Sequence, residues 1–202
     1  AITDHGVMYG AVAFYKAAVA AGIRPIIGCE VYVAPRGMTD RVHGVDNDAR
    51  HLVLLCENET GYRNLSYLVS MGFLQGFYGK PRVDLALLRQ HSEGLIALSA
   101  CLAGEIPRRL RTGDYDGAKA YALELSGIFG PEHFYLELQD HGIPTQKTVN
   151  QGLMRMCREL SMDLVATNDI HYILAEDAAA HDILLCIQTG KKVSDENRMR
   201  YE

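Results

Sequence analysis

The sequence predicts an α/β fold with a mostly parallel sheet, because of its alternating apolar runs, its helical periodicity and its length. Apolar runs of strand length alternate with segments of helical period along the chain, the order typical of helices that connect parallel strands. The chain has 202 residues, of which 48% are hydrophobic, enough for one core in a single domain, 1–202. Periodicity does not distinguish a closed barrel from an open, doubly wound sheet.

The first half of the chain begins with a short apolar segment that is typical of the end of a strand. Residues 9–21 predict an alanine-rich helix that ends at Gly22. Residues 25–34 form an apolar run typical of a buried strand, and the polar residues 35–48 predict a loop. The next expected elements are a strand at 51–56, a helix at 60–71 with Thr60 as its N-cap, and a glycine-bearing loop at 72–81.

The second half continues the alternation of strands and helices. Asp84 is expected to cap a short helix that reaches residue 91. Residues 94–101 predict a strand, and residues 115–129 carry the apolar stripe of a packed helix. The remaining expected elements are a strand at 134–139, a helix at 145–160, a strand at 163–167 and a helix at 175–188 that ends at Gly190.

Composition excludes several functional classes. The formal net charge of -5 argues against a domain that grips nucleic acid unaided, although bound cations would reverse the potential locally. Five scattered cysteines and the absence of a signal sequence favour a reducing cytoplasm. No apolar run approaches the roughly 20 residues that cross a bilayer. The chain opens at Ala1 without an initiating Met, so we expect a fragment of a longer protein.

Side chains that bind metals recur in or beside the predicted strands, mostly at strand ends, where different strands can bring them together. Imidazole, thiolate and carboxylate groups together suit zinc, while manganese or iron suits positions richer in oxygen and nitrogen. The candidate metal ligands are His5, Glu30, His51, Cys101, Asp169 and His171.

The carboxylates among these candidates give the sharpest local signals. Glu30 lies inside the apolar run 26–33, where an unpaired carboxylate is strongly disfavoured by desolvation. A bound cation would remove that penalty, but so would an arginine partner or an outward-facing side chain. Asp169 and His171 are two residues apart, so on extended backbone both would point toward one metal cluster.

The other candidates also have ordinary structural interpretations. His5 and His51 fit solvated residues beside strands, and Cys101 fits a small buried hydrophobe. Their joint placement at strand ends is what favours a shared site. His141 follows strand 134–139 and ranks below the six. The remaining histidines are expected to be solvated or to lie outside the ligand set: His43, His91, His133 and His181.

Seven segments spread over essentially the whole chain form a specific combination. They are TDHG at 3–6, IIGCEVYVA at 26–34, HLVLL at 51–55, ETGYRNL at 59–65, GLIALSACLAGEI at 94–106, ATNDIHY at 166–172 and HDILLCIQTG at 181–190. Together they resemble the PHP (polymerase and histidinol phosphatase) domain family, specifically the branch fused to bacterial DNA polymerase III alpha subunits.

This resemblance implies a distorted seven-stranded β/α barrel, here with its first strand-helix unit incomplete, around a cluster of up to three divalent metal ions. The family contributes nine ligands, and the six candidates above occupy matching positions. The other three belong to a His-x-His motif and a nearby Asp that precede the first helix of the family. The resemblance also implies catalytic roles for Asp169, His171 and His5, with residues 191–202 leading toward the polymerase core.

The implied activity is metal-dependent phosphodiester hydrolysis, in the form of a 3′ to 5′ proofreading exonuclease. Its expected partners are a DNA 3′ end presented by adjacent polymerase domains and other replisome subunits, with no membrane involved. One alternative is a non-catalytic domain that stabilises the polymerase or docks a proofreading subunit. A second alternative is a small-molecule phosphatase of the histidinol phosphatase kind.

Overall fold

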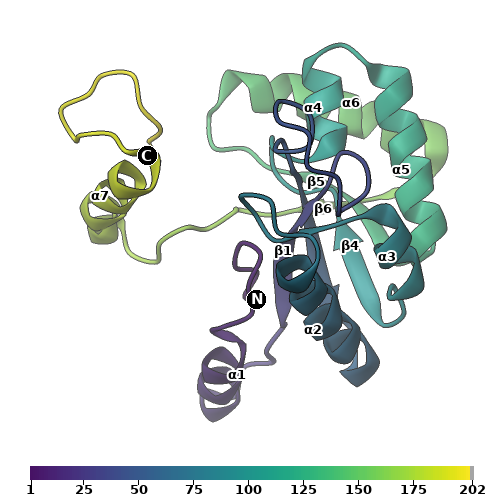
Figure 1. The fold of residues 1–202 in the computed structure, drawn as a ribbon, viewed down its shortest axis with the longest axis horizontal. Helices are drawn as coiled ribbons and strands as arrows, with labels where there is room; N and C mark the ends of the chain where they lie inside the picture. Colours follow the sequence, from purple (N-terminus) through teal and green to yellow (C-terminus); the bar gives the residue numbers. More distant parts are fainter. Residues whose placement is uncertain (201–202) are drawn as a thin grey trace. The chain divides into compact units, whose positions relative to one another are not determined.

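The computed structural model describes residues 1–200, so the last two residues of segment 191–202 lie outside the described part. The chain divides into two compact units, Ala1–Thr167 and a second unit that begins at Asn168. Figure 1 shows the elements of both, which are described separately below. The first unit contains every strand of the sheet.

The first unit is built on a six-stranded sheet with the order β3-β1-β2-β4-β5-β6. Its parallel pairs are β1 with β3, β4 with β5, and β5 with β6, whereas β2 runs antiparallel to both β1 and β4. The strand bounds are Gly28–Val33 (β1), Arg50–Cys56 (β2), Arg82–Val83 (β3), Leu95–Leu98 (β4), Phe134–Leu138 (β5) and Asp163–Ala166 (β6).

This sheet is open, so the expected seven-stranded barrel is not seen in residues 1–200. The edge strands β3 and β6 do not pair with each other, since β3 has two residues and pairs with β1 alone among the described strands. The predicted parallel character holds where helices connect β4, β5 and β6. Because the connection from β1 to β2 is a loop without a helix, those two strands run antiparallel.

The helices of the first unit largely follow their predicted positions. Asp84 caps α3 as expected, since its side chain accepts a hydrogen bond from the Leu87 N–H. The predicted N-cap at Thr60 is wrong, because Asn58 accepts from the Gly61 N–H instead. The bounds are Ala11–Ala20 (α1), Glu59–Leu74 (α2), Leu85–Gln90 (α3), Glu105–Arg111 (α4), Tyr115–Phe129 (α5) and Pro144–Leu160 (α6).

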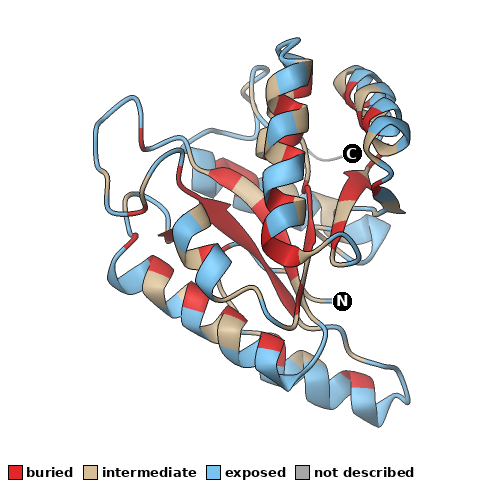
Figure 2. Ribbon diagram, turned by 90° about the vertical axis from the view of Figure 1, so that its right-hand side faces the viewer, coloured by how far each residue is buried: buried red, intermediate tan, exposed pale blue. Residues whose placement is uncertain are grey.

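The two faces of the sheet differ in what they carry. Residues that alternate along the strands, such as Cys29, Leu54 and Phe134, join the main core with the buried side chains of α2, α4, α5 and α6. Figure 2 shows these helices buried on one side and exposed on the other. The opposite face of the sheet carries a smaller apolar cluster around Val53 and Leu98. We call these the core face and the site face.

The loop between β1 and β2 is held by a buried arginine. The Arg82 side chain is 0% exposed and donates hydrogen bonds to four backbone carbonyl oxygens, those of Met38, Asp40, Asp46 and Gly76. These carbonyls satisfy a charged group that would otherwise be costly to bury. The polar segment 35–48, expected to be a loop, is therefore ordered by an edge strand of the sheet.

The second unit consists of a 3₁₀ turn and one helix. Residues Ala175–Asp177 form the turn, and α7 spans Ala178–Thr189. Gly190 ends the helix in the left-handed conformation, at φ 66°, as the sequence predicted. Of the helices in residues 1–200, none combines the length and apolar character that crossing a membrane requires.

Candidate metal centre

Glu30 lies near the middle of β1, with its side chain on the site face of the sheet. Its strand neighbours Cys29 and Val31 are buried in the core on the other face, because successive side chains of a strand alternate. Glu30 is itself buried, with 4% of the residue exposed. Of the interpretations open from the sequence, the outward-facing one is excluded, and the neighbours of this carboxylate are histidines.

His5 is brought to Glu30 by backbone pairing of the N-terminal segment with β1. The Gly6 N–H donates to the Glu30 carbonyl at 2.9 Å, and the Glu30 N–H donates to the Asp4 carbonyl at 3.1 Å. Gly6 has φ +66°, and a Cβ there would lie 2.9 Å from both Pro81 and Tyr32. The glycine is thus required for the chain to turn beside β1. His5 Nδ1 lies 3.2 Å from Glu30 Oε1.

His51 reaches the same carboxylate from the neighbouring strand. It pairs in register with Tyr32 across β1 and β2, so its side chain also lies on the site face, and its Nδ1 contacts Glu30 Oε1. Cys101 follows β4, and its Sγ lies 3.5 Å from His51 Nδ1. Four of the six predicted ligands therefore gather at one place in the first unit.

Opposing effects set the ionisation of Glu30. Burial raises the pKa of its carboxyl group. Hydrogen bonding to His5 and His51 and the charges of these two histidines lower the pKa by more, and the net result is a pKa of about 2. The carboxylate is therefore ionised at neutral pH. Both histidine Nδ1 atoms make ion-pair contacts with Glu30 Oε1, but their geometry is not that of a regular hydrogen bond, and this buried oxygen has no regular hydrogen-bond partner among the described residues. A cation bound among these three residues would compensate the charge of this buried oxygen.

The donor set fits a divalent metal ion. The ligand atoms of His5, Glu30 and His51 all lie within 4.8 Å of one another, and two imidazole nitrogens with one carboxylate oxygen form a common set for zinc and related ions. With Nδ1 of both histidines directed at Glu30 Oε1, a cation among them would replace poorly formed contacts with coordination. The residues of this structure thus fit a divalent metal ion.

Two residues beside the site were not found from the sequence. The Tyr32 ring lies 5.2 Å from the His51 ring and 6.3 Å from the His5 ring, between centroids. Lys80 Nζ lies 3.5 Å from the Tyr32 hydroxyl oxygen. Burial, followed by the charge of Glu30, raises the pKa of Tyr32, so its hydroxyl stays protonated. A hydroxyl donor and an exposed ammonium group therefore border the histidines.

Glu137 is a second buried carboxylate on the site face that the sequence analysis missed. It lies in β5 at 5% exposure, and burial is the largest cause that raises its pKa, with the charge of Glu30 adding to it. The signal was available, since Glu137 interrupts an apolar strand as Glu30 does. Unlike Glu30 Oε1, both carboxylate oxygens of Glu137 accept hydrogen bonds.

Asp169 and His171 belong to the second unit. The expected extended backbone is wrong here, because β6 ends at Ala166 and Asp169 has φ 46°, in the left-handed region. Within this unit, His171 Nδ1 lies 2.8 Å from the Asp169 carbonyl oxygen. An Nδ1–H that donates to this carbonyl leaves Nε2 as the nitrogen with a lone pair. Their role as metal ligands stays a prediction.

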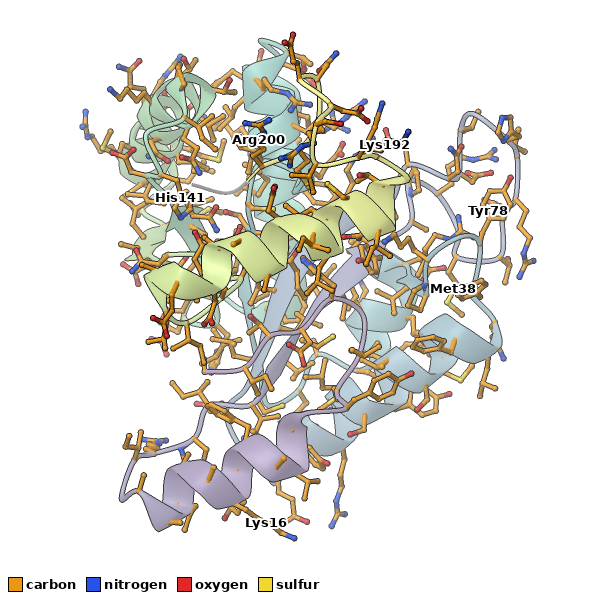
Figure 3. The ribbon with its side chains drawn as sticks, turned by 90° about the vertical axis from the view of Figure 1, so that its left-hand side faces the viewer. Lys16, Met38, Tyr78, His141, Lys192 and Arg200 are labelled. Atoms are coloured by element: carbon orange, nitrogen blue, oxygen red, sulfur yellow. The ribbon has the colours of Figure 1, made fainter. Side chains whose placement is uncertain are left out.

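His141, the lower-ranked candidate, is held by a glutamine of α6. Its Nδ1 lies 2.8 Å from Gln146 Nε2, and its backbone N–H donates to Gln146 Oε1 at 2.8 Å. Figure 3 shows His141 beside this helix, and Lys16 pointing outward from α1. The Gln146 side chain, 4% exposed, thus fixes the loop that follows β5.

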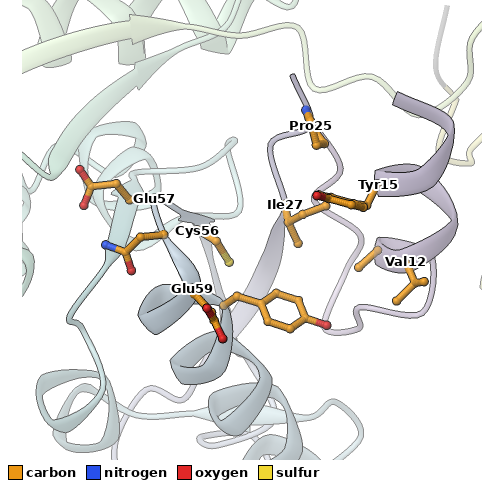
Figure 4. Close-up of a pocket in the computed structure, with 10 residues that line it drawn as sticks. Val12, Tyr15, Pro25, Ile27, Cys56, Glu57 and Glu59 are labelled. Atoms are coloured by element: carbon orange, nitrogen blue, oxygen red, sulfur yellow. The ribbon is translucent and has the colours of Figure 1, made fainter. Parts of the chain in front are cut away.

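A groove of about 530 Å³ lies between α1 and α2, away from these residues. Val12 and Tyr15 line it from α1, and Cys56 and Glu59 line it from the other side (Figure 4). None of the six predicted ligands contributes to its lining. The groove is mostly apolar, and it is separate from the candidate metal ligands.

Comparisons with known proteins identify the family of this chain. The sequence profile of the PHP domain family matches residues 1–141. The chain is 48% identical over 203 positions to the DNA polymerase III subunit alpha of Treponema pallidum, and equally to that of Thermus aquaticus. It is 41% identical over 221 positions to that of Saccharopolyspora erythraea. Each match covers 100% of this chain but 17 to 18% of the relative's length.

Proposed function

Because the chain belongs to the PHP domain family, we propose that it is the PHP domain of a bacterial DNA polymerase III alpha subunit and that it hydrolyses phosphodiester bonds. The observation that carries the proposal is the buried carboxylate of Glu30, whose oxygen and the ring nitrogens of His5 and His51 all lie within 4.8 Å of one another. A divalent metal bound there supplies Lewis-acid catalysis and a water of lowered pKa. Zinc suits the donors best, with manganese or iron as alternatives.

The ligand set that we propose extends beyond these three residues. Cys101 adds a thiolate next to His51, with Sγ 3.5 Å from Nδ1, and Asp169 and His171 add a carboxylate and an imidazole from the second unit. We assign catalytic roles to Asp169, His171 and His5. We further propose that the site face forms the interior of the family's barrel, with His5, Glu30, His51 and Cys101 along it.

Tyr32 and Lys80 would bind the substrate. A phosphodiester carries negative charge, and the Lys80 ammonium group beside the Tyr32 hydroxyl offers charge-assisted and neutral hydrogen bonds to its oxygens. The net charge of -5 gives the domain little general affinity for nucleic acid. We therefore propose that adjacent polymerase domains deliver a DNA 3′ end, that hydrolysis serves proofreading, and that other replisome subunits are the partners.

The test uses the full-length protein with metal content measured first. Nucleotide release from a 3′-labelled single strand is compared between the wild type and the variants Asp169→Ala and His171→Ala. We expect both variants to lose at least about tenfold in rate, because changing a group that only orients a ligand already costs about 10- to 100-fold. Matched controls are Asp163→Ala and His43→Ala, which change exposed residues outside the site.

Other outcomes separate the alternatives. Unchanged nucleotide release in both site variants would remove the catalytic proposal. Bound metal without hydrolysis, combined with unfolding on chelation, would identify a structural domain instead. Faster hydrolysis of phosphomonoesters such as histidinol phosphate than of the oligonucleotide would favour the small-molecule phosphatase.

A further inference from the structure

The Glu137 carboxylate connects the ends of three strands on the site face. Its Oε2 accepts the Ala100 N–H at 2.9 Å, just beyond β4. Its Oε1 accepts the Gln139 side-chain N–H at 3.1 Å and the Thr167 hydroxyl, just beyond β5 and β6. Its own backbone N–H donates to Ser99 Oγ at 2.8 Å. Because both carboxylate oxygens already accept hydrogen bonds, Glu137 is suited to position the groups that donate to it.

The backbone that Glu137 holds at Ala100 is strained. Ala100 is 2% exposed and has φ 63°, in the left-handed region that residues with a Cβ avoid. Such residues persist where their surroundings hold them, and they concentrate at functional sites. The turn is closed on its other side by a hydrogen bond of 2.9 Å from the Gly104 N–H to the Cys101 carbonyl.

This turn decides where Cys101 points. The reversed backbone at Ala100 directly precedes Cys101, whose Sγ lies 3.5 Å from His51 Nδ1. If Ala100 relaxed to an ordinary negative φ, the side chain that follows it would take a different direction. The hydrogen bond between Glu137 and the Ala100 N–H is therefore placed to fix the thiol beside the histidine.

We propose that Glu137 is a positioning residue that holds the Ala100 turn and thereby directs the Cys101 thiolate toward the metal site. The inference rests on the proposed function, since it takes Cys101 as a metal ligand. The same carboxylate holds Thr167, two residues before Asp169 in the sequence, so one side chain supports the segments that precede two predicted ligands. Outer-shell groups of this kind orient ligands without touching the metal.

The experiment measures Co²⁺ binding to the metal-free full-length protein, with the thiolate-to-cobalt charge-transfer absorption as the readout. This absorption reports coordination by sulfur, which a general loss of stability would not alter selectively. We expect Cys101→Ser to abolish the absorption. Glu137→Ala should weaken it and lower the Co²⁺ affinity about 10- to 100-fold. Glu132→Ala, which changes an exposed carboxylate before β5, is the matched control and should leave both unchanged.

Glu137→Gln provides an intermediate variant. A single amide oxygen cannot serve Ala100 on one side and both Thr167 and Gln139 on the other, so we expect an affinity between those of the wild type and Glu137→Ala. If Glu137→Ala does not fold, the Co²⁺ affinity and the absorption of Glu137→Gln test the inference. Wild-type affinity and absorption in a folded Glu137 variant would overturn the inference. An absorption that survives in Cys101→Ser would instead overturn the proposed ligation by Cys101.

Discussion

The two faces of the sheet use the same strands for different purposes. On the core face, Leu54 and Phe134 are fully buried against helices, and their neighbours are apolar. The site face carries Glu30, His51 and Glu137, and the two carboxylates among them are 4 to 5% exposed. Burial on the first face yields hydrophobic stabilisation, whereas burial on the second desolvates charged groups.

This difference indicates that the two faces are specialised, one for apolar packing and one for polar and charged groups. Apolar side chains on the core face gain free energy from the area that they remove from water. Burying a carboxylate such as Glu30 costs free energy instead. Its presence on the site face is therefore explained by the groups or ions that it binds. Substitutions on the core face should therefore change mainly the free energy of unfolding, and substitutions on the site face should change mainly the metal affinity.

The largest effect is expected on the core face. Phe134→Ala should lower the free energy of unfolding by about 3–5 kcal/mol, because it leaves a cavity where a 0% exposed aromatic side chain packs. The metal affinity of the folded protein should stay near that of the wild type. Denaturant unfolding and metal titration measure the two quantities, with Leu123→Ala at a 50% exposed site of α5 as the control. If Phe134→Ala lowered the free energy of metal binding as much as the free energy of unfolding, the proposed difference between the core face and the site face would be contradicted.

The next effect belongs to the site face. Glu30→Gln should weaken Zn²⁺ binding at least about 100-fold, or about 2.7 kcal/mol, because outer-shell changes alone cost about 10–100-fold. An amide keeps the shape of the carboxylate but removes the charge that faces His5 and His51. Competition with a chromophoric chelator measures the affinity, and Glu132→Gln is the matched control. Retained affinity in Glu30→Gln would remove this residue from the site.

A smaller, pH-dependent effect is expected at Asp46, which can be compared with Glu30. Asp46 is also a buried carboxylate, but both of its oxygens accept hydrogen bonds. Arg36 donates to both of its oxygens, at 2.9 and 2.6 Å, and the Val42 N–H donates at 2.7 Å. The hydrogen bond from Arg36 is the largest cause that lowers the Asp46 pKa to about 2, against an opposing effect of burial. This carboxylate therefore stabilises the loop between β1 and β2 by itself, without a metal.

The sign of the pH effect follows from the depressed pKa. Asp46 contributes stability above its ordinary pKa of 3.8 and loses that contribution as the pH falls toward 2. Asp46→Asn should thus be less stable than the wild type at pH 6, and the difference should shrink between pH 3.8 and 2. Denaturant unfolding at several pH values checks this, with Asp163→Asn as the exposed control. A difference that is constant across this range would contradict the ion pair.

Much of the local structure was predictable because it depends on residues near in sequence. The helix Tyr115–Phe129 and strand β5 were expected within a residue of their bounds, since periodicity and capping are local signals. The short helix α4 was missed because it is brief and contains Pro107. Proline is tolerated in a first turn, and burial of Ile106 and Leu110 in the core stabilises the helix.

The sequence by itself determined most of the order of strands and helices, although not α4 or β3, and it identified the candidate ligand side chains. Only the tertiary structure decided that β1 and β2 run antiparallel, that His5 lies beside Glu30, and that Glu137 holds the turn before Cys101. The physical reason is distance along the chain. Periodicity and capping act within a few residues, whereas strand pairing and ligand convergence join segments that the fold alone brings together.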